Sequence, residues 1–510
     1  MILKKLLDAI EIKDRKGAID ADHSVDGISN DSREIGEGDI FVAMKGVLAD
    51  GHDYIQKAKE KGAALAVVDH FTEDDIPQIL VDNPRMALAD LACTFYNHPS
   101  KEMKVFGVTA TNGKTSTAYM IRDLFKEAGY EVGVVGTVEV QYKDVSIPSI
   151  LTTPESIHLQ KHLRDMADAG VDVVVMEVSS SAQELYRSRG IDYDIVSFNN
   201  ISVEHLEQHG TFENYFHYKS RLIRHAEKKT AVILNIDAPL IEGLVDKTKG
   251  DVFTAGIEKD ASIGIDAIDL SSGFAKFNYV VRQGHHTDYW SLEPTVFPIQ
   301  LKVAGYHSVL NAMIAITYGL LEGIEGEVIQ KAMENFSGVE RRFELIYNKE
   351  YMILDDHFAN EKNIAVTLET LCHMEYKNLH LLYAIRGGRG AELNRDNALE
   401  MVKWMHKLPL KTFVATRSEE VVTKKDVVSE SELAAFKEVM ADAGYDVPVV
   451  DDLKSAIDKV WGEVGEGDVF LLAGCQGMDH GAKYVWESLA EKATGDERSD
   501  WMKKIENRIC

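Results

Sequence analysis

The chain has 510 residues, of which 45% are hydrophobic, and a formal net charge of −27. This length is enough for roughly three domains of ordinary size, each with its own core. Because no excess of basic residues is present to release counterions, the charge excludes nucleic acid and anionic membrane surfaces as bulk partners. The net negative charge does not exclude small anionic substrates, because local groups of Lys, Arg and helix N-termini can bind them.

The sequence contains four cysteines, Cys93, Cys372, Cys475 and Cys510. They show neither metal-ligand nor redox spacing, which favours a reducing compartment. The first residues alternate basic and acidic side chains and do not form a signal peptide. No apolar run approaches the roughly 20 residues needed to span a bilayer. We therefore expect a cytoplasmic protein without stable membrane insertion.

Residues 1 to about 100 are typical of a small α/β domain. Strands are predicted over 39–44 and 64–68, with a helix over 55–61 between them. Turns around these elements carry hydroxyl, guanidinium and imidazole groups, at Asp31–Ser32–Arg33 and Asp50–Gly51–His52. From the residues alone, turn formation and helix capping are the simpler explanation of these polar groups.

The strongest motif lies at Gly107–Ser116, where a strand, a glycine-containing turn and a helix follow one another. The helical pattern begins after Gly113 and ends near Gly129. In this context the N–H groups at the helix start face an anion, Lys114 adds a charge and the Thr115 hydroxyl ligates Mg²⁺. Five residues separate the two glycines of the turn, where the standard loop has four. We predict a variant phosphate loop that binds a nucleoside triphosphate.

Strand and helix patterns alternate from about residue 104 to 335, which predicts a mainly parallel sheet with helices on both faces. Further strands are expected at 133–136, 171–176, 195–198 and 232–235. The stretch from about 250 to 300 alternates polar and apolar residues and predicts antiparallel strands. An Ala-rich helix is expected to open at Gly305–Asn311.

Polar side chains follow several of these predicted strands. Glu177 ends the strand at 171–176, His205 lies in the loop after 195–198, and the next helix carries Lys219. Ligands bind at the carboxyl ends of strands in open α/β sheets. With Thr115, these residues offer donors to magnesium, which prefers oxygen and tolerates few nitrogens. Each residue alone is explained as a cap, a surface charge or a core histidine, but their shared position favours a site.

The third part of the chain starts near residue 338 and predicts a second, Rossmann-like sheet. Its strands are expected at 351–354, 379–385 and 468–473, and glycine turns follow at 386–390 and 474–477. Such turns approach phosphate closely because glycine has no side chain. Asp355–Asp356–His357 is open to two interpretations, a metal site or the cap of the next helix.

Together these motifs resemble the Mur ligase family, and most of all its members that add the third residue to UDP-N-acetylmuramoyl-dipeptide. The resemblance spans nearly the whole chain. It is carried by Thr109–Thr115, Thr152–Thr153–Pro154, Glu177–Val178–Ser179–Ser180, the motif from Asn200 through His205–Leu206 to His209–Gly210, and Tyr215–Phe216 with Lys219. The first domain matches the family's UDP-binding module at Asp31–Ser32–Arg33, Lys45–Gly46 and Asp50–Gly51–His52.

The resemblance implies an α/β fold of three domains and an ATP-dependent, ADP-forming ligase. The domains would be an N-terminal UDP-binding domain (1–102), a central P-loop ATPase domain (103–336) and a C-terminal Rossmann-like amino-acid-binding domain (337–510). ATP would phosphorylate a carboxylate, and an amine would attack the acyl phosphate to give an amide. Partners would be a UDP-linked peptide or sugar-peptide precursor and an amino acid, with the enzyme a monomer.

The resemblance also assigns roles to residues. Catalytic roles would fall to Lys114, Glu177, His205 and Lys219. The nucleotide would be bound by Thr111, Asn112, Gly113, Lys114, Thr115, Ser116, Asn235, His307, Asn311, Arg342 and Asp355. The substrate would be bound by Ser32, Thr152, Thr153, Ser179 and Arg187. Two Mg²⁺ would be held by Thr115, Glu177, His205 and Lys219, the last as a carbamylated lysine whose anionic group replaces a repelling ammonium.

The sequence departs from the family pattern at several positions. Ala110 replaces a glycine of the loop, and Ser181 replaces the histidine of Glu-Val-Ser-Ser-His. Glu204 and Glu207 replace two aspartates, and Cys475 stands where Ala-Gly-Lys-Gly-His is usual. The Asp-Asn-Pro-Arg signature for diaminopimelate is absent near 416–418, and the same tetrapeptide at 82–85 lies in another domain.

Three alternatives therefore stay open. The first alternative is a ligase of another cell-wall pathway, such as archaeal pseudomurein synthesis. The second is a ligase that forms polyglutamate or cofactor amides. The UDP-binding module weighs against the second of these. The third alternative is a nucleotide-binding regulator that has lost turnover, suggested by the altered third domain.

Overall fold

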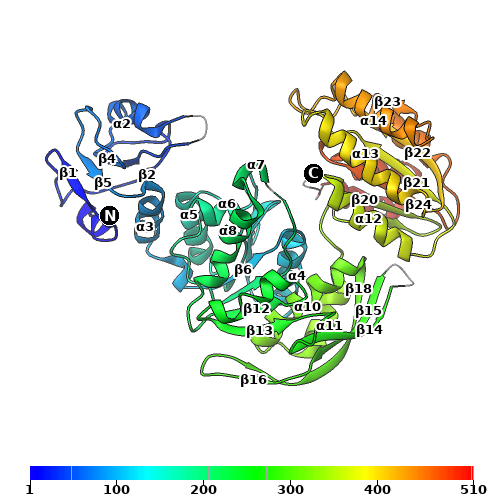
Figure 1. Ribbon diagram of the computed structural model, residues 1–510, viewed down its shortest axis with the longest axis horizontal. Coiled ribbons are helices and arrows are strands. Elements are labelled where there is room, and N and C mark those ends of the chain that lie inside the picture. The colour runs from blue at the N-terminus through cyan, green and yellow to red at the C-terminus, as the bar shows by residue number, and fades with distance from the viewer. Residues whose placement is uncertain (47–48, 205, 271–273, 507, 509–510) are drawn as a thin grey trace. The chain divides into compact units, whose positions relative to one another are not determined.

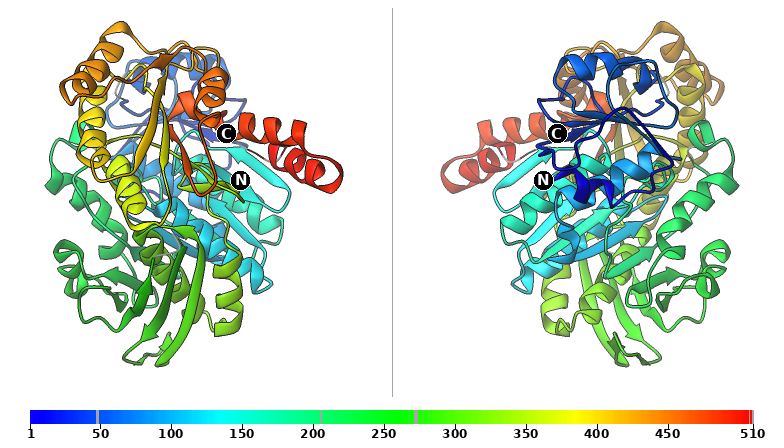
Figure 2. Two further views of the ribbon diagram at one scale, coloured as in Figure 1. Left: turned by 90° about the vertical axis from the view of Figure 1, so that its right-hand side faces the viewer. Right: turned by 90° about the vertical axis from the view of Figure 1, so that its left-hand side faces the viewer.

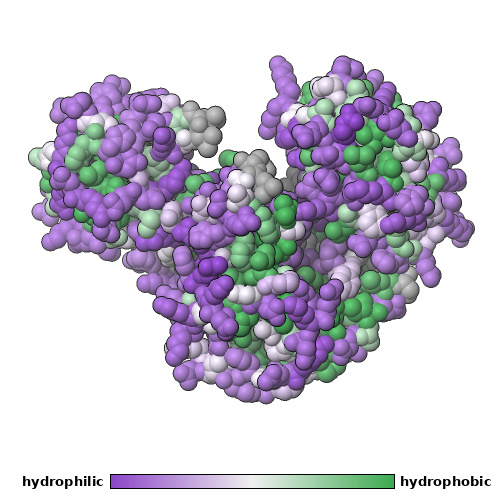
Figure 3. Space-filling view, viewed as in Figure 1, coloured by the Kyte–Doolittle hydropathy of each residue, from purple (hydrophilic) through white to green (hydrophobic). Residues whose placement is uncertain are grey.

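The computed structural model describes residues 1–46, 49–204, 206–270, 274–506 and 508 (Figure 1). The chain forms two compact units. The first comprises Met1–Gly264, Val281–Thr295 and Ile314–Val328, and the second comprises Ile265–Val280, Val296–Met313 and Ile329–Cys510. No helix in the described ranges is long and apolar enough to cross a membrane, and hydrophilic residues cover much of the face in Figure 3.

The first unit begins with a five-stranded sheet in the order β1-β5-β4-β3-β2. Its elements are α1 (Leu3–Leu7), β1 (Asp14–Lys16), β2 (Ile28–Ser29), β3 (Ile40–Val42), η1 (Gly51–Tyr54), α2 (Ile55–Glu60), β4 (Leu65–Val68), β5 (Gln78–Leu80), α3 (Pro84–Phe95) and η2 (Pro99–Lys101). All neighbours pair in parallel except β1 and β5. The predicted strands at 39–44 and 64–68 and the helix at 55–61 are confirmed.

Both faces of this sheet are buried, which explains the continuous apolar run of β4. Leu65 and Val67 pack with α1 and α3, whereas Ala66 and Val68 pack with α2. This alternation follows from the two-residue period of a strand. The parallel strands therefore end together at one edge, where the polar turns begin.

The tetrapeptide at 82–85 has a structural role. The Asn83 side chain accepts hydrogen bonds from the N–H groups of Arg85 at 3.0 Å and Met86 at 3.2 Å. Pro84 occupies the first turn of α3. An Asn cap followed by Pro is a common way to begin a helix, which accounts for this sequence without an amino-acid site.

The next strands belong to an eleven-stranded sheet, in which β14-β13-β12-β11-β6-β10-β7-β8-β9 are successive neighbours. Its elements are β6 (Lys104–Thr109), α4 (Lys114–Glu127), β7 (Val132–Val135), β8 (Glu139–Tyr142), β9 (Val145–Pro148), α5 (Ser156–Asp168), β10 (Val173–Glu177), α6 (Ser180–Glu184), β11 (Ile195–Phe198), α7 (Leu206–His209), α8 (Phe212–Arg224), β12 (Ala231–Asn235), α9 (Pro239–Glu242), η3 (Val245–Lys247), β13 (Asp251–Ala255) and β14 (Ile263–Asp269). Strands β13 through β7 run in parallel, as predicted. Their carboxyl ends, after Thr109, Glu177, Phe198 and Asn235, share one edge.

The prediction of antiparallel strands over 250–300 is partly wrong. Strand β13 pairs in parallel with β12, and β14 pairs in parallel with β13. Strands β16 (His285–His286) and β17 (Ser291–Leu292) pair antiparallel, as expected. Alternating hydropathy reports one solvated face and not strand direction, so it missed that β13 continues the parallel sheet.

Aromatic packing behind the phosphate loop fixes its strand. The Phe106 ring lies 5.1 Å from Phe125 of α4 and 5.3 Å from Tyr318. The Tyr318 hydroxyl donates to the Gly107 carbonyl at 2.9 Å. Each such aromatic pair contributes about 0.5–1.5 kcal/mol beyond its buried area. These buried contacts therefore fix the position of β6, the strand that leads into the loop.

The second unit contains most of β15 (Phe274–Val281), β18 (Thr295–Ala304) and α11 (Gly326–Asn335), the first half of α10 (Tyr306–Leu321), and a six-stranded sheet. That sheet has the order β19-β20-β24-β21-β22-β23. Its elements are β19 (Glu344–Asn348), β20 (Met352–Asp356), α12 (Glu361–His373), β21 (Leu379–Ala384), α13 (Ala391–Met405), β22 (Leu410–Thr416), α14 (Glu430–Asp442), β23 (Val449–Val450), α15 (Leu453–Trp461), β24 (Val469–Gly474), η4 (Gln476–Met478), α16 (Gly481–Lys492) and α17 (Gly495–Glu506). All pairs are parallel except β19 with β20.

Helices cover both faces of this sheet, as predicted for a Rossmann-like domain. Leu381 and Tyr383 pack with α12, α13 and α14, while Leu382 and Ala384 pack with α15 and α16. The two layers are visible on either side of the strands in Figure 2. The predicted strands at 351–354, 379–385 and 468–473 and the helix opening near 305–311 are confirmed.

We predict that Gly107→Ala destabilises the first unit. A Cβ on Gly107 would lie 2.9 Å from Tyr193 Cε1 and 3.3 Å from Val196 Cγ1. Overpacking of this kind costs about 1–3 kcal/mol, which thermal unfolding would measure. Gly243→Ala is the control, because its Cβ meets nothing closer than 3.5 Å. Equal melting temperatures for the two variants would contradict the packing described here.

Candidate functional site

The turn between β6 and α4 has the backbone geometry of an anion-binding loop. Gly113 caps α4 with φ of +82°, a left-handed conformation that favours glycine. Lys114 is the first residue of the helix, and its Nζ donates to the carbonyls of Ala110 at 3.0 Å and Thr111 at 3.2 Å. The Lys114 amino group therefore lies over the turn, beside the amides of the helix N-terminus, where an anion is stabilised.

The carboxyl end of β11 holds this turn in place. The Asn200 side chain accepts from the Asn112 N–H at 3.0 Å and donates to the Asn112 carbonyl at 2.8 Å. The Thr111 hydroxyl lies 3.0 Å from the Tyr215 hydroxyl. The sequence prediction did not include Asn200 or Tyr215 in the site. The polar pair at 199–200, directly after a predicted strand, was the signal available.

Glu177 is fully buried at the end of β10 and faces three donors. Its carboxylate accepts from the Thr115 hydroxyl at 3.0 Å, and from the Thr137 N–H and hydroxyl, both at 2.9 Å. A Cβ on Gly136 would lie 2.4 Å from the Glu177 carboxylate, so glycine at 136 makes room for it. Thr137 was not predicted, although it follows a glycine at a strand end.

These oxygen atoms fit a magnesium ion by their chemistry. A carboxylate and a hydroxyl 3.0 Å apart, next to an anion-binding turn, are the hard donors that Mg²⁺ prefers. The predicted pairing of Thr115 and Glu177 is thus present as a direct contact.

The predicted substrate residues of the first unit gather next to Glu177. Thr153 donates to the Glu177 carbonyl at 2.7 Å and accepts from the Ser179 N–H at 3.2 Å. The Thr152 hydroxyl lies 3.1 Å from that of Thr137. Arg187 pairs with Glu155 at 2.8 Å and donates to the Thr153 carbonyl at 3.4 Å.

Lys219 of α8 approaches the phosphate loop from the buried side. Its side chain is 2% exposed, and its Nζ donates to the Ala110 carbonyl at 2.7 Å. Burial and the neighbouring Lys114 lower the pKa of Lys219 well below its ordinary value, and the charge of Glu204 opposes this only in part. The structure therefore favours a neutral amine at this position. The predicted ligand His205 lies outside the described residues.

Other predicted residues of the first unit lie at or near strand ends. Asn235 ends β12, and its side chain donates to the Asn199 carbonyl at 2.8 Å. Asn199 in turn donates to the Thr117 hydroxyl at 3.0 Å, so a polar chain joins β12 to α4. Ser116 is in the first turn of α4, and Ser32 is buried in the turn after β2.

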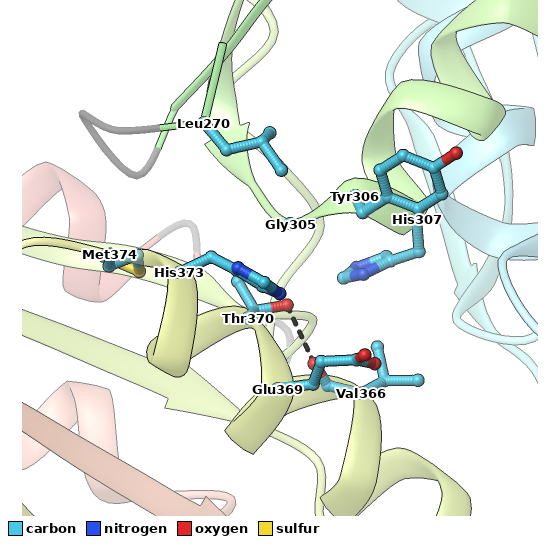
Figure 4. Close-up of a pocket in the computed structure, with 9 residues that line it drawn as sticks. All are labelled: Leu270, Gly305, Tyr306, His307, Val366, Glu369, Thr370, His373 and Met374. Carbon is cyan, nitrogen blue, oxygen red and sulfur yellow. Dashed lines mark hydrogen bonds between the residues drawn. The ribbon is translucent and has the colours of Figure 1, made fainter. Parts of the chain in front are cut away.

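In the second unit, His307 lines a cavity of about 340 Å³ (Figure 4). The cavity is lined by Leu270, Gly305, Tyr306, His307, Val366, Glu369, Thr370, His373 and Met374. Burial lowers the pKa of His307 to about 4, so its imidazole is neutral at pH 7. A mostly apolar wall with the neutral His307 ring and a few polar groups suits a flat heterocycle. Asn311 lies one turn further along α10 and is buried.

Asp355 and Asp356 do not cap the helix that follows them. Asp355 pairs with Arg508 at 2.7 Å and with Arg341 at 3.4 Å, and it is fully buried. Asp356 accepts from the Phe343 N–H at 2.7 Å. Asn360 caps α12 instead. The cap interpretation of Asp355–Asp356–His357 is therefore wrong, and the metal interpretation stays a prediction. Arg342 is partly exposed beside the pair.

The glycine turn at 386–390 is occupied by an acid of the protein itself. The Glu432 carboxylate accepts from the N–H groups of Arg389 at 2.8 Å and Gly390 at 2.7 Å. These bonds and those from Ser429 lower the pKa of Glu432 to about 2 against the effect of burial. The expectation that this turn approaches phosphate is not supported, because Glu432 already takes the anion's place.

Three family models match the chain in succession. They are the Mur ligase family, catalytic domain, over residues 24–96, the Mur ligase middle domain over 108–319, and the Mur ligase, glutamate ligase domain, over 341–476. The chain is similar to the UDP-N-acetylmuramoyl-L-alanyl-D-glutamate–2,6-diaminopimelate ligase of Bacillus velezensis. The two are 32% identical over 461 residues, 89% of each chain.

Solved structures share the fold. One of a UDP-N-acetylmuramoyl-L-alanyl-D-glutamate–2,6-diaminopimelate ligase matches with a TM-score of 0.68 and 20% identity over 93% of both chains. The MurF ligase of Thermotoga maritima in complex with ADP matches with a TM-score of 0.61 and 20% identity. That match covers 91% of this chain and 98% of the other.

We predict that Asn200→Ala loosens the phosphate loop. Loss of both side-chain bonds to Asn112 removes about 1 kcal/mol each, so amide exchange in peptides covering 108–116 should accelerate roughly 30-fold. Hydrogen exchange read by mass spectrometry measures this. Asn214→Ala, which removes a bond to the His209 carbonyl, is the control. Unchanged exchange in Asn200→Ala would show that the turn holds its shape alone.

Proposed function

The chain belongs to the Mur ligase family, and on this premise we propose that it is an ATP-dependent ligase that joins an amino acid to the peptide of a UDP-linked cell-wall precursor. The proposal rests on one observation above the others. The phosphate loop, the Glu177 carboxylate and the Lys219 amine meet around the Ala110–Thr115 turn. The similarity to curated diaminopimelate ligases extends over 89% of the chain, which supports the same reaction class.

In this proposal the triphosphate of ATP is bound at Thr111–Ser116. The N-terminus of α4 and Lys114 would neutralise its charge, and Asn200 keeps the turn rigid before ATP binds. Preorganised donors of this kind stabilise transferring phosphoryl groups without rearrangement during the reaction. Contacts to the rest of the nucleotide would come from Asn235 in the first unit, and from His307, Asn311, Arg342 and Asp355 in the second unit.

Thr115 and Glu177 would hold one Mg²⁺, and His205 with a carbamylated Lys219 a second. Bound magnesium supplies positive charge to the phosphate oxygens. The protein's own part is to present two oxygens 3.0 Å apart. Thr137 orients the Glu177 carboxylate through two hydrogen bonds.

The first chemical step would activate the precursor's terminal carboxylate. Its oxygen attacks the γ-phosphorus of ATP, a P–O bond to ADP breaks, and an acyl phosphate forms. Thr152, Thr153, Ser179 and Arg187 would orient the acyl part, because they surround the carboxyl end of β10. Ser32 and its neighbours would hold the uridine diphosphate.

In the second step the amine of the incoming amino acid attacks the acyl carbon. The C–O bond to phosphate breaks, phosphate leaves, and the nitrogen gives up its proton as the amide forms. Positioning carries this step, because an acyl phosphate is already reactive toward amines. The amino acid would bind in the C-terminal domain. We place the three domains at 1–102, 103–336 and 337–510, so that each boundary falls between two of the matched family regions.

The carbamate at Lys219 would form on a neutral amine. The nitrogen attacks dissolved CO₂, an N–C bond forms, one C=O π bond becomes the carboxylate, and a proton leaves to water. An ordinary lysine, with a pKa near 10.4, is almost wholly protonated at pH 7. Burial and the neighbouring Lys114 lower the pKa of Lys219, which raises the share of neutral amine. The carbamate then adds a negative charge at this position, which suits a metal neighbour.

We predict amino-acid-dependent release of phosphate from ATP with a UDP-linked peptide acceptor. A screen of the twenty amino acids and diaminopimelate identifies the co-substrate. Lys114→Met should lower turnover by about 100-fold or more, since it removes a charge from the transferred phosphate. Lys126→Met, in the last turn of the same helix, should keep it. A rate of phosphate release that is the same with and without every acceptor, or that is unchanged in Lys114→Met, would overturn the ligase proposal.

We also predict that ¹³C-labelled bicarbonate gives one carbamate resonance in the wild-type protein and none in Lys219→Ala. Lys219→Ala should lose ligation and recover part of it with added short carboxylates, which replace the lost anion. Lys219→Met keeps the buried volume and separates chemistry from packing. A wild-type protein without the resonance would contradict the carbamate while leaving the ligase proposal standing.

A further inference from the structure

A second group of metal-binding side chains lies at the carboxyl edge of the N-terminal sheet. Asp69 and His70 directly follow β4, and His52 lies on η1. One ligand atom from each of the three residues lies within 4.8 Å of the others. Within the described part of the chain, no other group of His, Cys, Asp and Glu residues meets this criterion. None of the three residues belongs to the phosphate-loop site.

His52 is held in one orientation by Asp50. The His52 Nδ1 lies 2.7 Å from Asp50 Oδ1, and the same oxygen accepts the His52 backbone N–H at 3.0 Å. A carboxylate at Nδ1 fixes the proton there and leaves a lone pair on Nε2. This carboxylate–histidine pair is the usual support of a metal-ligating imidazole.

The free nitrogen of His52 is buried and faces a carboxylate. The His52 side chain is 5% exposed, and Nε2 lies 3.3 Å from Asp69 Oδ1. Among the described residues, Nε2 has no hydrogen-bond partner. A lone pair on the buried Nε2 that faces an anionic oxygen is unfavourable, although the Asp69 side chain itself is 38% exposed. A cation between the two atoms turns this repulsion into two favourable contacts.

His70 supplies a third donor from the solvent side. Its Nδ1 lies 2.6 Å from Asp69 Oδ1, and its ring stacks on that of His52 with centroids 4.0 Å apart. The His70 side chain is 59% exposed, so it rotates at little cost. The stack keeps both imidazoles next to one carboxylate oxygen, and the open side leaves room for water.

We propose that His52, Asp69 and His70 bind a divalent transition-metal ion, with zinc as the representative. Two imidazoles and one carboxylate with an open fourth position form a common zinc ligand set. Magnesium is disfavoured, because two of the three donors are nitrogens. Asp50 acts as a positioning residue for His52. The inference uses none of the residues assigned to ATP, and it shares only the Asp50–Gly51–His52 turn with the predicted UDP-binding module.

Calorimetric titration of the metal-stripped full chain with Zn²⁺, in excess Mg²⁺ and without nucleotide, tests this site. We expect one saturable Zn²⁺ per chain, and a visible absorption band when Co²⁺ replaces it. His70→Ala should weaken binding about tenfold or more, and Asp50→Asn about 10–100-fold, as second-layer carboxylates do. His406→Ala, another exposed histidine, should change nothing.

Folding is checked separately, because His52 is buried. His70→Ala changes an exposed side chain and should keep the melting temperature of the stripped protein. Added Zn²⁺ should raise the melting temperature of the wild type more than that of His70→Ala, because the variant binds the ion more weakly. Absence of saturable Zn²⁺ binding, or equal affinity in the wild type, His70→Ala and Asp69→Asn, would overturn the proposal. Neither result bears on acceptor-dependent phosphate release.

Discussion

Two lysine amino groups share one carbonyl oxygen in the first unit. Lys114 and Lys219 donate to the Ala110 carbonyl at 3.0 and 2.7 Å. Two ammonium groups this close repel each other, and burial adds a desolvation cost, so this arrangement disfavours two charged amines. Burial, with the neighbouring Lys114, lowers the pKa of Lys219 well below its ordinary value. In the proposed mechanism Lys114 would supply positive charge to the phosphate, and Lys219 would supply the amine that CO₂ carbamylates.

Rigid surroundings keep the Ala110 carbonyl in the position where both lysines reach it. The turn that presents Ala110 is fixed on one side by Asn200 and on the other by the packing of β6 against Phe125 and Tyr318. Glu177 is oriented by Thr137. Preorganisation of this kind suits phosphoryl transfer, in which alignment and charge neutralisation contribute more than an acid–base pair.

Much of this arrangement was predictable because it depends on local sequence. Strand β6, the start of α4 and the position of Glu177 follow from periodicity and turn chemistry. The hydrogen bonds of Asn200 to the phosphate loop and of Thr137 to Glu177 were not predicted. These two residues acquire their roles only when parallel strands bring their ends together. The direction of β13 was missed, since alternating hydropathy does not report it. Glu432 filling the turn at 386–390 and Asp355 pairing with Arg508 depend on contacts far apart in sequence.

The account's central claim is that the turn around Ala110 serves transfer of a phosphoryl group to a carboxylate. An acceptor with ¹⁸O in its terminal carboxyl group tests this most directly, by mass spectrometry of the phosphate released during ligation. Attack of the carboxylate on the γ-phosphorus, followed by cleavage of the acyl C–O bond, places one ¹⁸O in each phosphate. Phosphate free of the label would contradict the claim.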